Sequence, residues 1–176
     1  MEIPENYINV YTTPLQADQI NRIILKYTDL YSVITDATAG IGGNATYFCK
    51  KFKYVNLIEN NYNVIEFLKS NTSSYSNKVI YTCSYNTIKY ILKQDVIFID
   101  PPWGGTDYKN KKNINLFLDN ENVLSIIENM YNYTQFVFLK VPNNFPQEIF
   151  SNFWNIKSHN VSKSKKNIYK IIVFYK

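Results

Sequence analysis

The stretch VIFIDPPWGG, residues 96–105, sets the interpretation of the whole chain. Its first four residues are apolar and mostly β-branched, which predicts a short buried strand. Two prolines then end this strand, because proline has no N–H to donate to a neighbouring strand. Asp100 therefore stands at the carboxyl end of a strand, with the flat ring of Trp103 just beyond it.

This arrangement suits a planar ring that carries an exocyclic amine. The Asp100 carboxylate and the Pro101 carbonyl can accept hydrogen bonds from such an amine, while Trp103 stacks on the ring. RNA-binding proteins stack unpaired bases on aromatic side chains in this way, at about 1–3 kcal/mol per base. The alternative is that Asp-Pro-Pro is only a turn and Trp103 a core aromatic, since such turns are common.

Strand-like and helical patterns alternate on both sides of this stretch. Strands are expected at residues 33–35, 54–58, 79–83, 95–99 and 135–141, and helices at 13–30, 44–52, 64–70, 86–93 and 119–131, the last capped by Asp119. A helical turn at 146–150 precedes two more strands, 154–162 and 167–175, joined by a basic turn. The alternation predicts an α/β fold, a mostly parallel seven-stranded sheet with helices on both faces and a C-terminal antiparallel hairpin.

A glycine-rich turn, DATAGIGGN at residues 36–44, follows the first expected strand. Its glycines permit close approach to a ligand, and the helix after it offers unpaired N–H groups. The pattern lacks the G-x-G-x-x-G spacing of dinucleotide-binding turns and the Gly-Lys-Ser/Thr of phosphate-binding loops. It suits a ligand with an amino-acid tail, with Asp36 facing the ammonium group and the turn N–H groups facing the carboxylate.

Glu59 ends the second expected strand, roughly 20 residues beyond the glycine turn, where an acidic residue typically binds both hydroxyls of a ribose. The alternative is an ordinary surface glutamate. The Gly40 turn, Tyr85, Asp100 and Asn143 also follow strands. Because the carboxyl ends of parallel strands meet at one edge of the sheet, where ligands bind, all five places are expected to converge on one site.

Composition limits the remaining classes of function. The 176 residues fit one domain, residues 13–176, preceded by a short extension, residues 1–12. Two cysteines and one histidine supply neither a disulfide framework nor a metal cage. No apolar run reaches the ~20 residues of a membrane span, and the acidic N-terminus lacks a secretory signal, so we expect a cytoplasmic or nuclear protein. The net charge of +5 fits an RNA partner, and the abundant asparagine, lysine and isoleucine indicate A+T-rich coding, as in some protists and large DNA viruses.

Two motifs together, DATAGIGGN at residues 36–44 and DPPWGGTDY at residues 100–108, resemble the cap guanine-N2 methyltransferases, the trimethylguanosine synthases. The resemblance extends from about Thr13 to Asn144. It implies a Rossmann-like class I methyltransferase that uses S-adenosylmethionine to methylate the N2 amine of 7-methylguanosine in RNA caps.

The resemblance also implies a role for each matching residue. The methionine part of the cofactor would contact Asp36, Ala37, Gly40, Gly42 and Asn44, with Thr13 at its border, Glu59 on the ribose and Tyr85 near the adenine. Asp100 and Pro101 would align the amine with the methyl donor, and Asp100 would also touch the cofactor. Trp103 would stack on the methylated base, with Tyr108 in the same pocket.

Three places differ from the family. Ser84 and Tyr85 stand where an acidic residue usually reads the adenine amine. The residues after the fifth strand lack the usual arginine, so Lys140 is expected to contact the cap phosphates, and Asn143 is expected to bind the substrate. Only twelve residues precede Thr13, so a protein partner is a candidate to complete the cap pocket. Two alternatives therefore stay open, an N2-guanine or N6-adenine methyltransferase acting on internal RNA or DNA bases, and an inactive cap-binding subunit.

Overall fold

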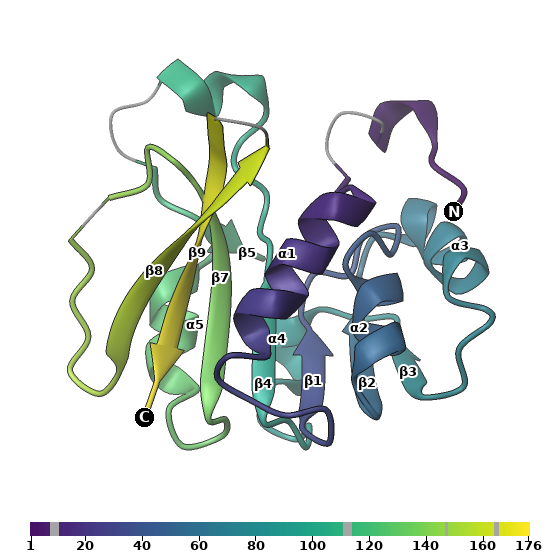
Figure 1. Ribbon diagram of the computed structural model, residues 1–176, viewed down its shortest axis with the longest axis horizontal. Helices are drawn as coiled ribbons and strands as arrows, with labels where there is room; N and C mark the ends of the chain where they lie inside the picture. The colour runs from purple at the N-terminus through teal and green to yellow at the C-terminus, as the bar shows by residue number, and fades with distance from the viewer. Residues whose placement is uncertain (8–10, 111–113, 147, 164–165) are drawn as a thin grey trace.

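The computed structural model describes residues 1–7, 11–110, 114–146, 148–163 and 166–176. A sheet of seven strands forms its centre, as the ribbon in Figure 1 shows. The strand order is β3-β2-β1-β4-β7-β9-β8. The bounds are β1 Val33–Asp36, β2 Tyr54–Ile58, β3 Lys78–Tyr81, β4 Val96–Ile99, β7 Phe136–Pro142, β8 Asn155–Lys163 and β9 Lys166–Tyr175. The first five strands in that order pair in parallel, whereas β9 pairs antiparallel with both β7 and β8. The expected parallel sheet with a closing hairpin is confirmed.

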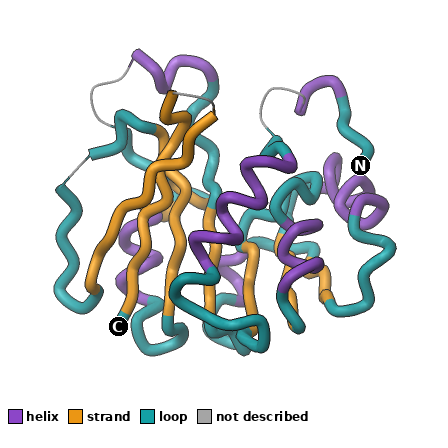
Figure 2. Tube along the Cα trace, viewed as in Figure 1, coloured by secondary structure: helices purple, strands orange, loops and turns teal. Residues whose placement is uncertain are grey.

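Helices cover both faces of the sheet (Figure 2). Their bounds are α1 Pro14–Ile24, α2 Ala45–Lys51, α3 Tyr62–Asn71, α4 Tyr85–Ile88 and α5 Val123–Asn129, with 3-10 turns η1 Glu5–Tyr7 and η2 Thr106–Asn110. Apolar residues of α1 and α2 share one buried cluster, and those of α4 and α5 share the other. Along β4, Phe98 belongs to the first cluster and Ile97 and Ile99 to the second. This period of two explains why a strand buried on both faces appears as a continuous apolar run.

Several expectations about local structure differ from what is observed. The helix expected at 13–30 ends at Ile24, and the one expected at 86–93 spans only Tyr85–Ile88. The helix expected at 119–131 begins only at Val123, with Asn122 as its N-cap, and Asn122 accepts the amide N–H of Leu124 at 2.9 Å. Before it lies a small antiparallel hairpin, β5 Phe117–Leu118 and β6 Glu121–Asn122. The sequence also predicts a helical turn at 146–150, but residues 148–150 form no helix.

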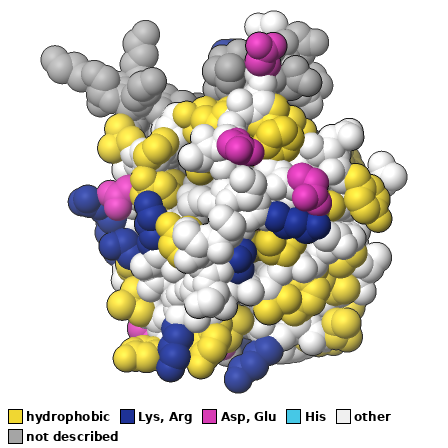
Figure 3. Space-filling model, turned by 90° about the vertical axis from the view of Figure 1, so that its right-hand side faces the viewer, with side chains coloured by type: hydrophobic (Ala, Val, Ile, Leu, Met, Phe, Trp, Pro, Cys, Tyr) yellow, Lys and Arg dark blue, Asp and Glu magenta, His cyan; other side chains and the backbone are white. Residues whose placement is uncertain are grey.

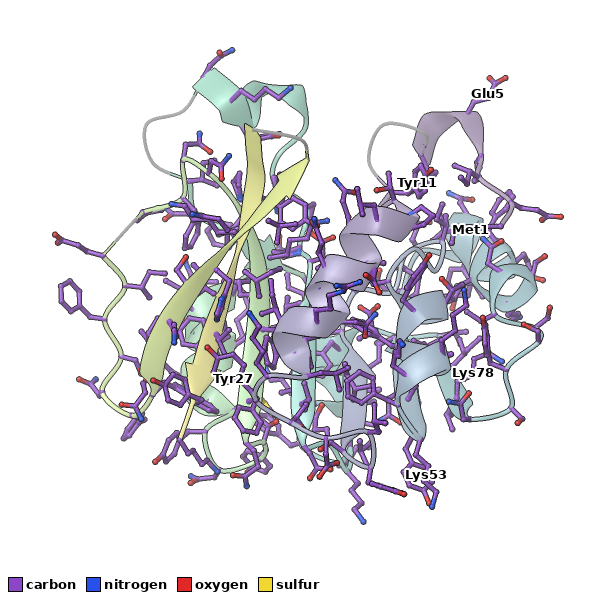
Figure 4. All side chains as sticks on the ribbon, viewed as in Figure 1. Met1, Glu5, Tyr11, Tyr27, Lys53 and Lys78 are labelled. Atoms are coloured by element: carbon purple, nitrogen blue, oxygen red, sulfur yellow. The ribbon has the colours of Figure 1, made fainter. Side chains whose placement is uncertain are left out.

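The parallel strands all end at one edge of the sheet, which Figure 1 shows as the upper edge of β1 and β7. In Figure 4 the side chain of Tyr11 lies toward this edge, and that of Lys53 lies at the opposite one. The glycine turn, Glu59 and Asp100 follow the strands at the upper edge. The fold therefore brings the predicted ligand-binding residues to one side of the sheet, as such sheets generally do.

Candidate functional site

The glycine turn between β1 and α2 leaves space on one side and permits close packing on the other. A Cβ atom built on Gly40, whose φ is +52°, would meet nothing within 4 Å. A Cβ on Gly43 would lie only 2.9 Å from the backbone carbonyl oxygen of Thr12. The segment before α1 therefore passes directly over the turn, and position 43 accepts only glycine without a backbone shift.

Asp36 lies beneath this turn and is fully buried. One carboxylate oxygen accepts the Thr38 amide N–H at 3.2 Å, and the other, Oδ2, has no partner among the described residues. Burial raises the pKa of Asp36 to about 8, reinforced by the charges of Asp100 and Glu59 and opposed by the Thr38 hydrogen bond and the charge of Lys140. The carboxyl group is therefore mostly protonated at neutral pH in the free protein.

The titration of Asp36 makes a testable contribution to stability. Between pH 4 and 8 the folded protein holds a proton that the unfolded chain has released, so the free energy of unfolding falls as the pH rises. We expect wild type to lose on the order of 1 kcal/mol per pH unit relative to Asp36→Asn across this range. Urea unfolding of both proteins from pH 5 to 8 measures the difference, and parallel pH profiles would contradict it.

Glu59 closes the turn from the end of β2. Its two oxygens accept the amide N–H groups of Gly40, at 2.8 Å, and Asn61, at 2.7 Å. These bonds fix the carboxylate beside the open space above Gly40, and the side chain stays half-buried. The predicted ribose-binding residue is therefore held in one orientation next to room for a ligand.

A buried ion pair joins the ends of β4 and β7. The Lys140 ammonium donates to Asp100 Oδ2 at 2.7 Å and to Thr12 Oγ1 at 3.1 Å, and the lysine side chain is 7% exposed. The Asp100 amide N–H donates to the Thr38 hydroxyl at 2.8 Å. Asp100 is thus held by two neighbouring elements, β7 and the turn after β1, while its side chain keeps an exposed fraction of 19%. This exposed part is available to a substrate at the carboxyl edge of the sheet.

Aromatic rings surround the same ammonium group. Lys140 Nζ lies 4.7 Å from the ring centroid of Tyr169 and 5.6 Å from that of Trp103. The Trp103 ring is half-buried, packs edge-on against Tyr108 at 5.2 Å and lies 6.4 Å from Tyr169. Asn144 donates to the Tyr108 carbonyl oxygen at 2.7 Å, which ties η2 to the chain after β7. The Trp103 indole nitrogen is buried and has no partner among the described residues.

Three predicted site residues lie differently from the expectation. Tyr85 is 1% exposed and donates to Gln94 Oε1 at 3.2 Å, so its side chain belongs to the core and cannot contact adenine. Lys140 points into the site, where Asp100 neutralises it, so the arrangement does not favour the expected phosphate contact. Thr13 precedes α1 as expected, but Thr12 is the threonine whose hydroxyl is buried in the site.

The other predicted residues meet at the expected edge. Ala37, Gly42 and Asn44 are buried in or under the turn, and the Asn44 amide donates to the Thr12 hydroxyl at 3.1 Å. Pro101 is buried directly after Asp100, whereas Asn143 is exposed. Tyr169, which sequence reasoning did not single out, lies at the floor of the site. It reaches the site because β9 pairs with β7 and sets Tyr169 opposite Pro142.

Charge is distributed without a dominant patch on the face of the molecule in Figure 3, where lysine and arginine side chains occupy several separate places with hydrophobic ones between them. Within the described ranges, no group of three or more histidine, cysteine, aspartate or glutamate side chains is placed to hold a metal ion. The same ranges contain no helix of the length and hydropathy that crossing a membrane requires.

Comparisons with known proteins agree with this geometry. The model of a family described as RNA cap guanine-N2 methyltransferase matches residues 31–174. The uncharacterized protein L320 of Acanthamoeba polyphaga mimivirus is 35% identical over 151 residues, which cover 82% of this chain and 58% of the viral protein. The chain thus spans little more than half of the length of this relative.

Solved structures share the fold at low sequence identity. An rRNA methylase from Streptococcus thermophilus has a TM-score of 0.62 and 9% identity, covering 94% of this chain and 97% of its own. A Streptococcus mutans protein solved in complex with S-adenosylhomocysteine (SAH) has a TM-score of 0.60 and 12% identity, covering 90% and 96%. These likenesses establish a Rossmann-like methyltransferase fold.

Proposed function

The chain belongs to the RNA cap guanine-N2 methyltransferase family, and from this membership we propose that it methylates the N2 amine of 7-methylguanosine in RNA caps. The proposal covers the cofactor, S-adenosylmethionine, and the roles of the residues described above. The main support for this substrate is the place of the Asp100 carboxylate, close to the half-buried ring of Trp103. An ion pair with Lys140, 2.7 Å long, holds the carboxylate there.

The residues at the glycine turn fit S-adenosylmethionine. Space is open above Gly40, and Glu59 presents a carboxylate there for the ribose hydroxyls. Two buried acceptor oxygens near the turn, Asp36 Oδ2 and Asn44 Oδ1, lack partners among the described residues. Such orphaned oxygens are what the ammonium group of an amino-acid tail would satisfy, because its positive charge favours the ionised form of Asp36. When bound, the cofactor supplies an electrophilic methyl group on a positively charged sulfur.

The protein's own contribution to methyl transfer is positioning. The N2 amine of guanine is barely basic, so its lone pair has to be aimed at the methyl group. Asp100 accepts a hydrogen bond from the amine in the proposed complex, and Trp103 fixes the plane of the base. Holding reactants in line in this way supplies a large part of many enzymatic rate enhancements. Lys140 acts through Asp100, because its ammonium holds one carboxylate oxygen and leaves the other for the substrate.

One observation favours methylation of an uncharged base in internal RNA or DNA. Lys140 Nζ already lies 5.6 Å from the centroid of the Trp103 ring. A cationic 7-methylguanine stacked on that ring would therefore meet a second positive charge, although Asp100 partly neutralises it. Selectivity between methylated and unmethylated guanine separates the two substrates.

Calorimetric titration of m7GTP and of GTP, each with SAH present, tests the proposal. We expect m7GTP to bind more tightly, and Trp103→Ala to weaken it about 10- to 100-fold, the value of one stacked base. Tyr31→Ala is the control, because this tyrosine is 72% exposed and lies just before β1, at the opposite edge of the sheet. Equal or absent binding of both nucleotides, with SAH still bound, would favour the internal-base substrate.

A further inference from the structure

The turn at the tip of the β5–β6 hairpin reaches across the carboxyl edge of the sheet. Asp119 Oδ1 accepts a hydrogen bond from the Asn60 side-chain amide at 2.9 Å, and Oδ2 accepts one from the Ser84 hydroxyl. Asn60 follows β2, and Ser84 follows β3. One carboxylate, from a segment more than thirty residues away in sequence, thus bridges the ends of two neighbouring strands.

The hairpin is anchored where it stands. The Asn86 side chain donates to the Leu118 carbonyl oxygen at 3.0 Å. On the other strand of the hairpin, Glu121 forms a 2.9 Å ion pair with Lys89, whose side chain is 4% exposed. Asp119 and Asn120 have φ values of 49° and 67°, a two-residue turn that aspartate and asparagine tolerate better than most residues. The position of the Asp119 carboxylate therefore follows from bonds on both sides of the turn, one to α4 and one to the residue that ends it.

This position is where the base of a nucleoside would lie. In the sheet order β3-β2-β1, the glycine turn follows β1 and Glu59 follows β2. A nucleoside whose ribose is held by Glu59 and whose tail lies on the glycine turn extends its base in the opposite direction, toward the end of β3. The six residues after β3, Thr82 to Thr87, include no acid. The carboxylate that reaches this place comes from the hairpin instead.

We propose that Asp119 selects adenine in the cofactor by accepting a hydrogen bond from its exocyclic amine. This inference rests on the proposed S-adenosylmethionine site and adds the residue that reads the base. An ionised carboxylate only accepts hydrogen bonds, and its two oxygens can accept about four, so the bonds from Asn60 and Ser84 leave capacity for the amine. Asp119 is exposed, which leaves it accessible to the ligand. A base with a carbonyl oxygen in place of the amine would face the carboxylate acceptor to acceptor.

Calorimetric binding of SAH and of its inosine analogue, S-inosylhomocysteine, tests this selection without an activity assay. We expect wild type to prefer SAH by on the order of 10- to 100-fold, the range for a hydrogen bond to a charged group. Asp119→Asn should remove most of this preference, because the amide can also donate to the inosine carbonyl. Asparagine suits the positive φ at this position, and the ratio of two ligands on one variant does not depend on the folded fraction.

Asp18→Asn is the matched control, because it makes the same change on α1, where the carboxylate pairs with Arg22 and lies outside the hairpin. It should retain the preference for SAH. Equal binding of both ligands to wild type, or the same loss of preference in Asp18→Asn and Asp119→Asn, would overturn the proposal and leave the cofactor site standing. Failure of wild type to bind SAH at all would overturn the cofactor site as well.

Discussion

Replacing Asp100 by asparagine is expected to lower kcat/KM for methyl transfer by on the order of 100- to 1,000-fold, the range for the loss of one preorganised hydrogen-bonding group. Asparagine keeps the size of the side chain, but it has no negative charge and only one acceptor oxygen, for which Lys140 competes with the substrate amine. SAH should still bind, because the glycine turn and Glu59 are unchanged. Transfer of labelled methyl groups to m7G-capped RNA measures the effect, with SAH calorimetry alongside it.

The same substitution should destabilise the protein. Lys140 is 7% exposed and pairs with Asp100 at 2.7 Å, so the asparagine leaves a buried ammonium group without its carboxylate. Losing one partner of a buried ion pair typically costs about 3–5 kcal/mol. Thermal unfolding of Asp100→Asn should show a correspondingly lower Tm than that of wild type.

A double variant separates the two effects. Lys140→Met in the Asp100→Asn background removes the uncompensated charge, and apolar replacements of a buried pair are often neutral for stability. We expect the double variant to regain most of the lost Tm but none of the lost activity. Recovery of activity together with stability would mean that Asp100 acts only through folding, and normal activity in Asp100→Asn would rule out its proposed role.

The sheet and the edge that carries the site followed from the sequence because their signals are local. Apolar β-branched runs such as 54–58 are typical of buried strands, and the strand at 54–58 was confirmed with identical bounds. The glycine turn and Asp100 each follow such a run directly, so predicting the strands also placed these residues. The carboxyl ends of parallel strands then meet as a matter of geometry.

The ion pair could not be predicted because it depends on the register between strands. A lysine within the apolar stretch 136–142 looks like an ordinary break in the pattern. The structure pairs Ile99 with Leu139, so the next residues along, Asp100 and Lys140, come side by side. The hairpin before α5 was missed for a different reason. Asp119 and Asn120 suit both a helix cap and a tight turn, and only the contacts to Asn60 and Ser84 decide between them.

Replacing Glu59 by alanine is expected to weaken SAH binding by on the order of 100-fold. In the proposed complex the carboxylate accepts hydrogen bonds from the two ribose hydroxyls, and hydrogen bonds to charged groups contribute about 1.5–3 kcal/mol each. The alanine also frees the amide N–H groups of Gly40 and Asn61, which Glu59 holds at 2.8 and 2.7 Å. Calorimetry of SAH binding to wild type and variant measures the loss.

Two further variants give this result its meaning. Glu66→Ala removes an exposed carboxylate of α3, which pairs with Lys69, and should leave SAH affinity unchanged. Glu59→Gln keeps one acceptor oxygen for the turn and should lose less affinity than the alanine. If SAH bound Glu59→Ala as tightly as wild type, Glu59 would be only a clamp on the glycine turn, and the ribose would have to lie elsewhere. That outcome would also contradict the placement of the base beside Asp119, because this placement assumes that Glu59 binds the ribose.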